Sequence, residues 1–261
     1  MRSISRVVGC SINTVTKLLV DAGNTCFEYH DAMVQNVKSR RVQCDEIWSF
    51  YYSKQKNVPK GKEGEAGDVW TWTAIDADSK LILSWMAGDR SAETAQAFMQ
   101  DLATRLATRV QLTTDGYIVY LEAVEGAFGA DIDYATLIKH YGSSPESEVR
   151  YSPPKVVGCS AATVTGKPDA KHVSTSYVER QNLTMRMSMR RFTRLTNAFS
   201  KKLENHIHAL SLYFFYYNFV RIHKSLRVSP AMEAGVVDHL MSFEDLVGLI
   251  DQREQDMKDS N

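Results

Sequence analysis

Apolar residues near the start of the chain recur at helical spacing. Residues 3–23 predict two short helices that meet at Gly9, with Ser11 as the N-cap of the second helix and Gly23 as its end. The apolar stripe of the second helix would consist of Ile12, Val15, Leu18 and Leu19. Two helices joined in this way are typical of the last two helices of a helix-turn-helix. The residues that would then face DNA are Asn13, Thr14, Thr16 and Lys17.

After residue 40, β-branched and aromatic residues predict a region rich in strands. Five strands are expected, at residues 41–53, 69–75, 81–86, 109–114 and 132–140. A helix over 91–108, capped by Ser91, and another over 117–128 would separate the last three strands. The polar segment 54–68 and the longer segment 142–173 are expected to be loops, the second with a hairpin around 156–164.

The segment 175–194 predicts a helix with one carboxylate at the head of a basic row. At helical spacing, four side chains would point the same way: Glu179, Asn182, Arg186 and Arg190. A metal-binding acid beside a phosphate backbone would explain this pattern, and a solvated basic helix is the plain alternative. A strongly apolar helix over 201–220 and an acidic helical tail after Pro230 complete the chain.

Composition excludes several classes of protein. With 261 residues and 44% hydrophobic content, the chain can bury one sizeable core. It has no long apolar run that would indicate a membrane span or a secretory signal, so a cytoplasmic protein is expected. The four cysteines form no CxxC pair, which argues against a zinc site or a disulfide framework.

The formal net charge of zero hides a segregation of charge along the chain. Residues 1–41 carry a net charge of +3, residues 42–166 carry −6, residues 167–227 carry +9 and residues 228–261 carry −6. Basic segments on either side of an acidic middle indicate a polyanionic partner and a centre lined with carboxylates.

Three acids could form that centre. Asp45 lies in the first expected strand and Asp115 follows the fourth, so the two would be neighbours if these strands are parallel. Glu179 would approach from the helix packed across that edge. Three converging carboxylates repel one another unless hard cations lie between them, and two Mg²⁺ ions, or Mn²⁺ in their place, would meet that need. Glu46 should point to the opposite face of its strand.

Other candidates for this chemistry have plainer interpretations. Asp76 and Asp78 are expected in a turn, and Asp133 at the edge of a strand. A two-metal mechanism needs no histidine base, so the histidines are expected to be satisfied core or surface residues; they are His140, His206, His208 and His223. Three tryptophans, Trp48, Trp70 and Trp72, are expected in the core or in cross-strand packing.

Three motifs together resemble the IS1 family of insertion-sequence transposases, which are of the DDE type. They are DEIWSF at residues 45–50, TDGY at 114–117 and ERQNLTMRMSMRRFTRLTNAFSKK at 179–202. SINTVTKLL resembles the helix-turn-helix of that family, so the resemblance covers most of residues 3–220. The zinc-finger portion of the family is absent from this sequence, and an upstream reading frame is expected to encode it. HKSLRVSPAMEAG is similar to the ending of other DDE transposases.

The resemblance implies an RNase H-like fold, a mixed five-stranded α/β sheet flanked by helices. It divides the chain into a partial helix-turn-helix and linker (1–36), a catalytic domain (37–227) and an acidic tail (228–261). It also implies that Asp45, Asp115 and Glu179 bind metal and catalyse DNA cleavage and strand transfer, in a homo-oligomer that joins two element ends to target DNA. Arg186, Arg190 and Asn182 would contact DNA, together with Asn13, Thr14 and Lys17. A nuclease that does not join DNA and a DNA-binding protein without catalysis remain alternatives.

Overall fold

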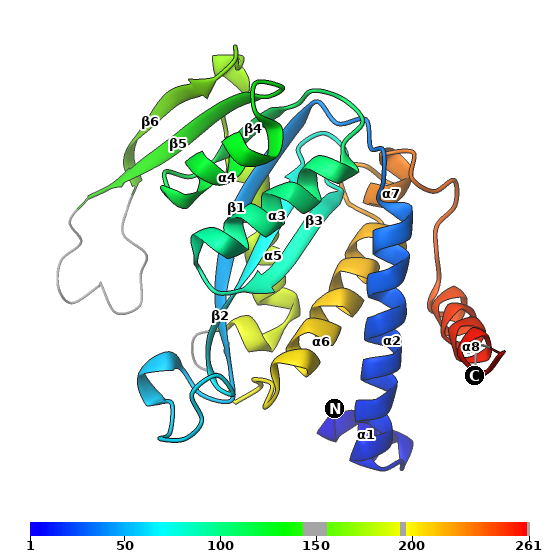
Figure 1. Cartoon of the computed structure of the whole chain (residues 1–261). Coiled ribbons are helices and arrows are strands. Elements are labelled where there is room, and N and C mark those ends of the chain that lie inside the picture. Colours follow the sequence, from blue (N-terminus) through cyan, green and yellow to red (C-terminus); the bar gives the residue numbers. More distant parts are fainter. Residues whose placement is uncertain (143–155, 194–196, 260–261) are drawn as a thin grey trace. The chain divides into compact units, whose positions relative to one another are not determined.

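Six strands form one mixed sheet in the order β3-β2-β1-β4-β5-β6 (Figure 1). The structure is a computed structural model that describes residues 1–142, 156–193 and 197–259. The strands are β1 (Arg41–Tyr51), β2 (Gly67–Asp76), β3 (Ile82–Gly88), β4 (Gln111–Thr114), β5 (Asp133–Tyr141) and β6 (Val156–Thr165). The five strands predicted from the sequence are therefore confirmed.

The predicted count of five strands is wrong, because β6 adds a sixth. β6 pairs with β5 in antiparallel fashion, with Leu137 opposite Ala161. The sequence predicts a hairpin around residues 156–164. The local pattern does not indicate that this segment pairs with β5. The rest of that expected loop at 143–155 lies outside the described residues.

Eight α-helices are described in the ranges given above. They are α1 (Arg2–Val8), α2 (Ile12–Met33), α3 (Ala92–Arg105), α4 (Val119–Phe128), α5 (Ser176–Ser188), α6 (Leu203–Phe215), α7 (Pro230–Glu233) and α8 (Phe243–Asp259). Three short 3₁₀ turns are η1 (Gln55–Asn57), η2 (Ala170–His172) and η3 (Arg190–Phe192), and a π-helical turn, η4 (Tyr216–Val220), continues α6. No helix in these ranges is long and apolar enough to cross a membrane.

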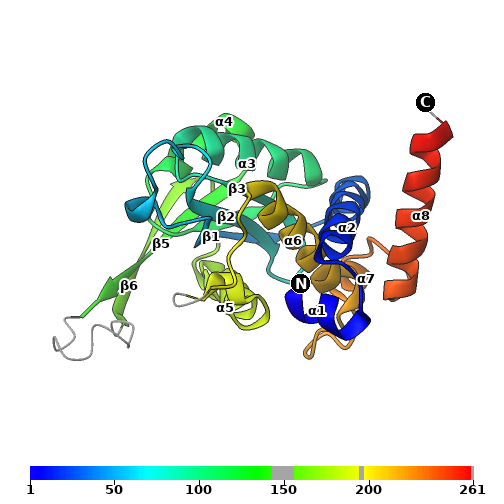
Figure 2. The ribbon, with the colours of Figure 1, turned by 90° about the horizontal axis from the view of Figure 1, so that it is seen from below.

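The chain divides into two compact units. The first consists of Met1–Val37, Trp48–Trp70 and Arg186–Asn261, and the second of Lys38–Ile47 and Thr71–Met185. In the second unit, α3 and α4 cover one face of the strands and α5 covers the other (Figure 2). Trp72 on β2 is fully buried there, with the rings of Phe98 and Tyr120 packed against it at 5.9 and 5.4 Å. This aromatic group forms the core under α3 and α4.

The core of the first unit lies between α2 and α6, which run side by side (Figure 1). Tyr29 of α2 packs edge-on against Phe215 and Phe219, at centroid distances of 5.6 and 5.0 Å. Helix α8 also packs on α2, where Arg253 donates to both carboxylate oxygens of Glu28 at 2.7 and 2.8 Å. The acidic tail is therefore a helix with a specific contact.

The first two helices differ from the prediction. Gly9 ends α1 at φ 72°, and Ser11 accepts a hydrogen bond from the Asn13 backbone N–H, as expected. However, α2 runs on to Met33, so residues 24–33 are helix and not a linker. Of the expected stripe, Val15 is buried, whereas Leu18 is 57% exposed. The helix-turn-helix is therefore not confirmed.

Gly23 does not end α2. It lies inside the helix, where another helix approaches closely. A Cβ added at Gly23 would lie 2.4 Å from the Cβ of His208 on α6, far inside the contact distance of two carbon atoms. Glycine at this position allows the backbones of α2 and α6 to come close. A glycine in a helical pattern can therefore indicate close packing as well as a helix end.

Gly23→Ala is expected to destabilise the protein by about 1–3 kcal/mol, because the new methyl group overpacks the contact with His208. Helix propensity alone predicts the opposite sign, a gain of up to ~1 kcal/mol. Gly248→Ala in α8 is the matched control, since a Cβ there meets nothing within 4 Å and should stabilise. Urea unfolding of both variants measures the difference. Two stabilised variants would contradict the close approach.

Candidate functional site

Asp45 and Asp115 are brought together by two parallel strands. β1 and β4 pair in parallel with Arg41 opposite Gln111 and Gln43 opposite Thr113. The same register, continued by two residues, places Asp45 beside Asp115, the first residue beyond β4. The expected parallel pairing of these strands is therefore confirmed.

A tight turn holds Asp115 in place. Its Oδ1 atom accepts a hydrogen bond from the Tyr117 backbone N–H at 2.9 Å, so the carboxylate caps its own turn. A Cβ added at Gly116 would lie 2.6 Å from Cγ1 of Ile138 on β5. The Asp-Gly pair is needed because a larger residue after Asp115 would collide with the neighbouring strand.

Helix α5 is attached to the same face of β1 that carries Asp45. Gln43 accepts hydrogen bonds from the backbone N–H groups of Tyr177 and Val178, at 2.8 and 3.2 Å, and so satisfies the first turn of α5. Asp45, two residues along the strand and therefore on the same face, accepts from Nδ2 of Asn182 at 2.8 Å. Both contacts fix α5 across the strand.

Glu46 points away from this site, as alternation along a strand requires. Its side chain is 1% exposed and accepts hydrogen bonds from Arg90 at 2.7 Å and from the Tyr120 hydroxyl at 2.9 Å. Tyr120 belongs to α4, on the opposite face of the sheet (Figure 2). Glu46 therefore has its own structural partners and does not compete with Asp45.

Glu179 has a cationic partner from β5. Lys139 donates to both of its carboxylate oxygens, and the hydroxyl of Thr175 donates at 2.6 Å. The Glu179 side chain is 40% exposed, so it reaches solvent as well as the lysine. This ion pair supplies a positive charge beside the third carboxylate.

The carboxylates act on one another electrostatically. Burial above all, and then the negative charges of Glu46, Asp115 and Glu179 in that order, together raise the pKa of Asp45 to about 7. The hydrogen bond from the Glu46 backbone N–H opposes the shift. The negative charges of Asp115 and Glu179 thus disfavour ionisation of the Asp45 carboxyl group.

The donor chemistry of the site suits a hard divalent cation. Carboxylate and amide oxygens are the ligands that Mg²⁺ takes, and Oδ1 of Asn182, beside Asp45, is a buried acceptor without a hydrogen-bond partner. Each carboxylate, however, is engaged by a group of the chain itself. Within the described ranges, no group of three His, Cys, Asp or Glu residues is arranged to hold a metal ion.

The residues expected to contact DNA fall in different places. Asn182 is buried against Asp45, so it does not share an exposed face with Arg186. Arg190 is exposed but lies in η3 because α5 ends at Ser188, so the expected basic row on one helix is wrong. The chain leaves the helix at Met189, and Phe192 is then buried. Arg194, the expected helix end, is outside the described residues.

The N-terminal residues expected at DNA are exposed. Asn13 and Thr14 lie on the first turn of α2, and Ser11 caps that turn. Lys17 is 70% exposed in its side chain and pairs with Asp21 at 2.7 Å and with Glu254 of α8 at 3.4 Å. Its charge is therefore partly neutralised within the first unit.

The competing aspartates have structural roles. Asp76 accepts hydrogen bonds from the backbone N–H and hydroxyl of Ser79, which confirms its predicted role in the turn. Asp133 pairs with Arg109 at 2.9 Å at the start of β5.

The histidines also have ordinary structural settings. His206 is fully buried next to Ser49, and burial, together with the positive charge of Arg191, lowers its pKa to about 3. His140 lies 2.6 Å from the hydroxyl of Ser160.

Sequence reasoning missed Gln43 and Lys139. Gln43 stands two residues before Asp45, so strand alternation could have placed both on the face that α5 covers. Lys139 had no comparable signal, because its contact with Glu179 joins β5 to a helix 40 residues later. A local pattern does not contain such a tertiary ion pair.

Asp45→Asn is expected to stabilise the chain at high pH when divalent metal is chelated. Because the pKa of Asp45 in the folded chain is about 7 and its ordinary value is 3.8, the folded chain keeps a proton that the unfolded chain releases between these values. The stabilisation that this bound proton gives to the folded chain is therefore complete below about pH 4 and is lost as the pH rises through about 7.

Asparagine does not ionise, so the variant should exceed the wild type by about 2–4 kcal/mol at pH 8 and by little at pH 4. Chemical denaturation with EDTA at both pH values measures this difference. Asp251→Asn on exposed α8 is the control and should show no such change with pH. If the stability difference between Asp45→Asn and the wild type is the same at pH 4 and pH 8, the crowding of negative charge around Asp45 is refuted.

Two solved structures are similar to this chain at a low level. One contains an intasome of simian T-cell lymphotropic virus in complex with the PP2A regulatory subunit B56 gamma, with 12% identity and a TM-score of 0.44 over 76% of this chain and 55% of that chain. The other contains piggyBac transposase in a synaptic complex with hairpin DNA, with 11% identity and a TM-score of 0.34 over 82% and 52%. The chain thus spans about half the length of each. No family model and no curated protein matches it.

Proposed function

We propose that this chain is a metal-dependent DNA transposase of the DDE type with an RNase H-like catalytic domain. The observation that carries the proposal is the meeting of Asp45, in the middle of β1, with Asp115, just beyond the parallel strand β4, while Glu179 is near enough to help raise the pKa of Asp45. A buried aspartate surrounded by other carboxylates is unfavourable for folding alone. Its presence is explained if the group binds cations.

Asp45, Asp115 and Glu179 are the residues that would hold two Mg²⁺ ions, or Mn²⁺ in their place. Bound there, the ions would activate a water molecule or a 3′-hydroxyl group and stabilise the departing oxygen of a phosphodiester. The chain's own groups position these ligands. Asn182 orients the Asp45 carboxylate from α5, and the Tyr117 N–H orients that of Asp115.

Lys139 is the counter-ion of Glu179 in the structure. Its ammonium group contacts both carboxylate oxygens, which are the atoms that a cation would need. Cation binding therefore requires Lys139 to leave at least one of them. The released ammonium group would lie beside the site, where it could bind a phosphate oxygen of DNA.

DNA is the proposed partner because positive charge is concentrated in one segment of the chain. Residues 167–227 carry a net charge of +9, and Arg186 and Arg190 are exposed in this segment. Asn13, Thr14 and Lys17 would add contacts from the N-terminal helices. Because two element ends must be cut and joined together, we also propose that the chain acts as a homo-oligomer.

A joining assay tests the proposed function. The protein would be incubated with Mg²⁺, a supercoiled target plasmid and labelled duplexes made from the DNA that flanks its coding sequence. Labelled DNA joined to the plasmid without added ligase is the expected result. EDTA should abolish the joined product.

Other outcomes identify the competing functions. Cleaved but unjoined DNA would indicate a nuclease that transfers the strand only to water, since the same metals activate water and a 3′-hydroxyl. Binding of the duplexes without cleavage in either Mg²⁺ or Mn²⁺ would indicate a DNA-binding protein without catalysis. Either result would overturn the assignment as a transposase.

A further inference from the structure

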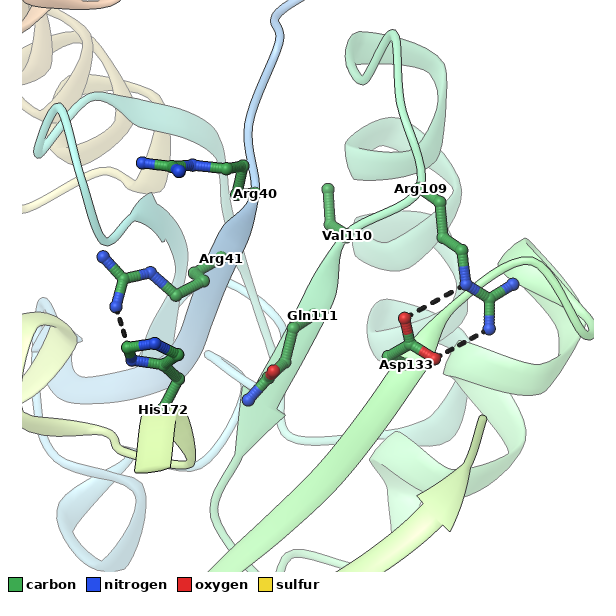
Figure 3. Close-up of a pocket in the computed structure, with 7 residues that line it drawn as sticks. All are labelled: Arg40, Arg41, Arg109, Val110, Gln111, Asp133 and His172. Atoms are coloured by element: carbon green, nitrogen blue, oxygen red, sulfur yellow. Dashed lines mark hydrogen bonds and ion pairs between the residues drawn. The ribbon is translucent and has the colours of Figure 1, made fainter. Parts of the chain in front are cut away.

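A second polar site lies in the second unit at the ends of the strands where β1, β4 and β5 begin. An open pocket of about 560 Å³ is present there (Figure 3). It is lined by Arg40, Arg41, Arg109, Val110, Gln111, Asp133 and His172. Asp45 lies four residues further along β1 than Arg41, Asp115 follows the last residue of β4, and neither lines the pocket, so the pocket is separate from the carboxylate site.

Arg109 on one side of the pocket is a structural clamp. Its guanidinium donates to Asp131, to both carboxylate oxygens of Asp133, and to the backbone carbonyls of Ala130 and Ile132. These five hydrogen bonds occupy all five of its donors. Arg109 therefore shapes the wall and has no capacity left for a ligand.

The other side of the pocket has spare positive charge. Arg41 donates to Asp78 and, at 2.7 Å, to Nδ1 of His172, which leaves part of its donor fork unused. The Arg40 side chain is 85% exposed, and its Nε lies 3.6 Å from Oδ2 of Asp78, beyond hydrogen-bond range. The Asp78 carboxylate is therefore the nearest negative group to two guanidinium groups, those of Arg40 and Arg41.

The position of His172 in the pocket is fixed by a side-chain clamp. Gln111 on β4 accepts a hydrogen bond from the Asp169 backbone N–H at 2.9 Å and donates to its carbonyl at 3.1 Å. Asp169 in turn caps η2, the turn that carries His172. The pocket is therefore held open by the fold before any ligand arrives.

We propose that Arg40, Arg41 and His172 bind a phosphate group of the DNA backbone. Guanidinium forks match the oxygens of a phosphate in geometry and charge. His172, whose Nδ1 lies 2.7 Å from Arg41, can donate from Nε2, which lies 3.8 Å from Oδ2 of Asp169, beyond hydrogen-bond range. An open pocket with a protruding Arg40 suits a phosphate that belongs to an extended polymer. This inference rests on the proposed function only in requiring that the chain binds DNA, and not on its catalysis.

Arg40→Gln tests the site without disturbing the fold, because the side chain is exposed and makes no close hydrogen bond to Asp78. Fluorescence anisotropy with a labelled duplex in EDTA measures affinity across a series of NaCl concentrations. We expect affinity to fall about 3–10-fold at ~0.1 M salt and the salt slope to fall by about 1, whatever the sequence of the duplex. Arg40→Lys should restore most of the affinity.

Lys258→Gln on the acidic helix α8 is the control, since it also removes one exposed positive charge. It should leave both quantities unchanged. Equal affinity of Arg40→Gln and this control would overturn the proposed phosphate site while leaving the proposed function intact. Absence of DNA binding by the wild type would overturn both.

Competition by sodium phosphate and pyrophosphate distinguishes the source of the phosphate. At constant ionic strength, they should displace the duplex no better than sodium chloride does. Micromolar displacement that depends on Arg40 would show a site for free phosphate and would overturn the assignment to DNA.

Discussion

Asp115→Asn is expected to reduce DNA cleavage and joining on the order of 10³-fold or more, roughly 4 kcal/mol in the barrier. The amide cannot supply the negative charge that a divalent ion needs from this position. The turn should survive, because the amide oxygen can still accept the hydrogen bond from the Tyr117 N–H. DNA affinity in EDTA should therefore stay within about threefold of the wild type, as no phosphate contact is lost.

Asp251→Asn is the matched control, because it also replaces one carboxylate by an amide, at an exposed position on α8. It should retain cleavage and joining close to those of the wild type. Gel assays of labelled duplex at saturating protein measure both variants. Cleavage by Asp115→Asn at the rate of the control would refute the assignment of Asp115 to the site.

Arg90→Ala is expected to destabilise the protein by about 3 kcal/mol. The substitution leaves the Glu46 carboxylate, which is 1% exposed, with Tyr120 as a hydrogen-bond donor but without its cation. It also removes the guanidinium that stacks 3.9 Å above the ring of Tyr117. Urea unfolding at pH 7 measures the loss.

Glu46→Gln combined with Arg90→Ala should recover a large part of this stability, because a buried amide needs no counter-ion. Arg253→Ala, which breaks a partly exposed pair with Glu28, is the control and should cost about 1 kcal/mol or less. A double variant no more stable than Arg90→Ala alone would show that stacking, and not the buried charge, accounts for the effect.

The order of strands and helices in the sheet could be predicted from the sequence because β-branched and aromatic residues mark strands wherever they pair. The adjacency of Asp45 and Asp115 followed from a general rule, since a helix between two strands favours a parallel crossover. The sixth strand and the length of α2 could not be predicted in the same way. β6 is defined by its partner β5, and Gly23 by its contact with His208.

The supporting contacts of the candidate site were also beyond the sequence. Helical spacing predicts that Asn182 and Arg190 share one face with Glu179. In the structure α5 ends before Arg190, and Asn182 donates a hydrogen bond to Asp45 on β1. The pairing of Glu179 with Lys139 depends on how β5 and α5 lie in space. The adjacency of Asp45 and Asp115 was therefore predictable from the sequence, whereas the groups that hydrogen-bond or ion-pair with these carboxylates and with Glu179 were not.

The most direct test of the central claim is an anomalous-difference map from crystals of the protein grown with Mn²⁺. We expect manganese peaks bound by the carboxylates of Asp45, Asp115 and Glu179, with Lys139 displaced from at least one oxygen of Glu179. Manganese bound elsewhere, with these three carboxylates keeping their present partners at saturating metal, would contradict the claim that they form one catalytic centre.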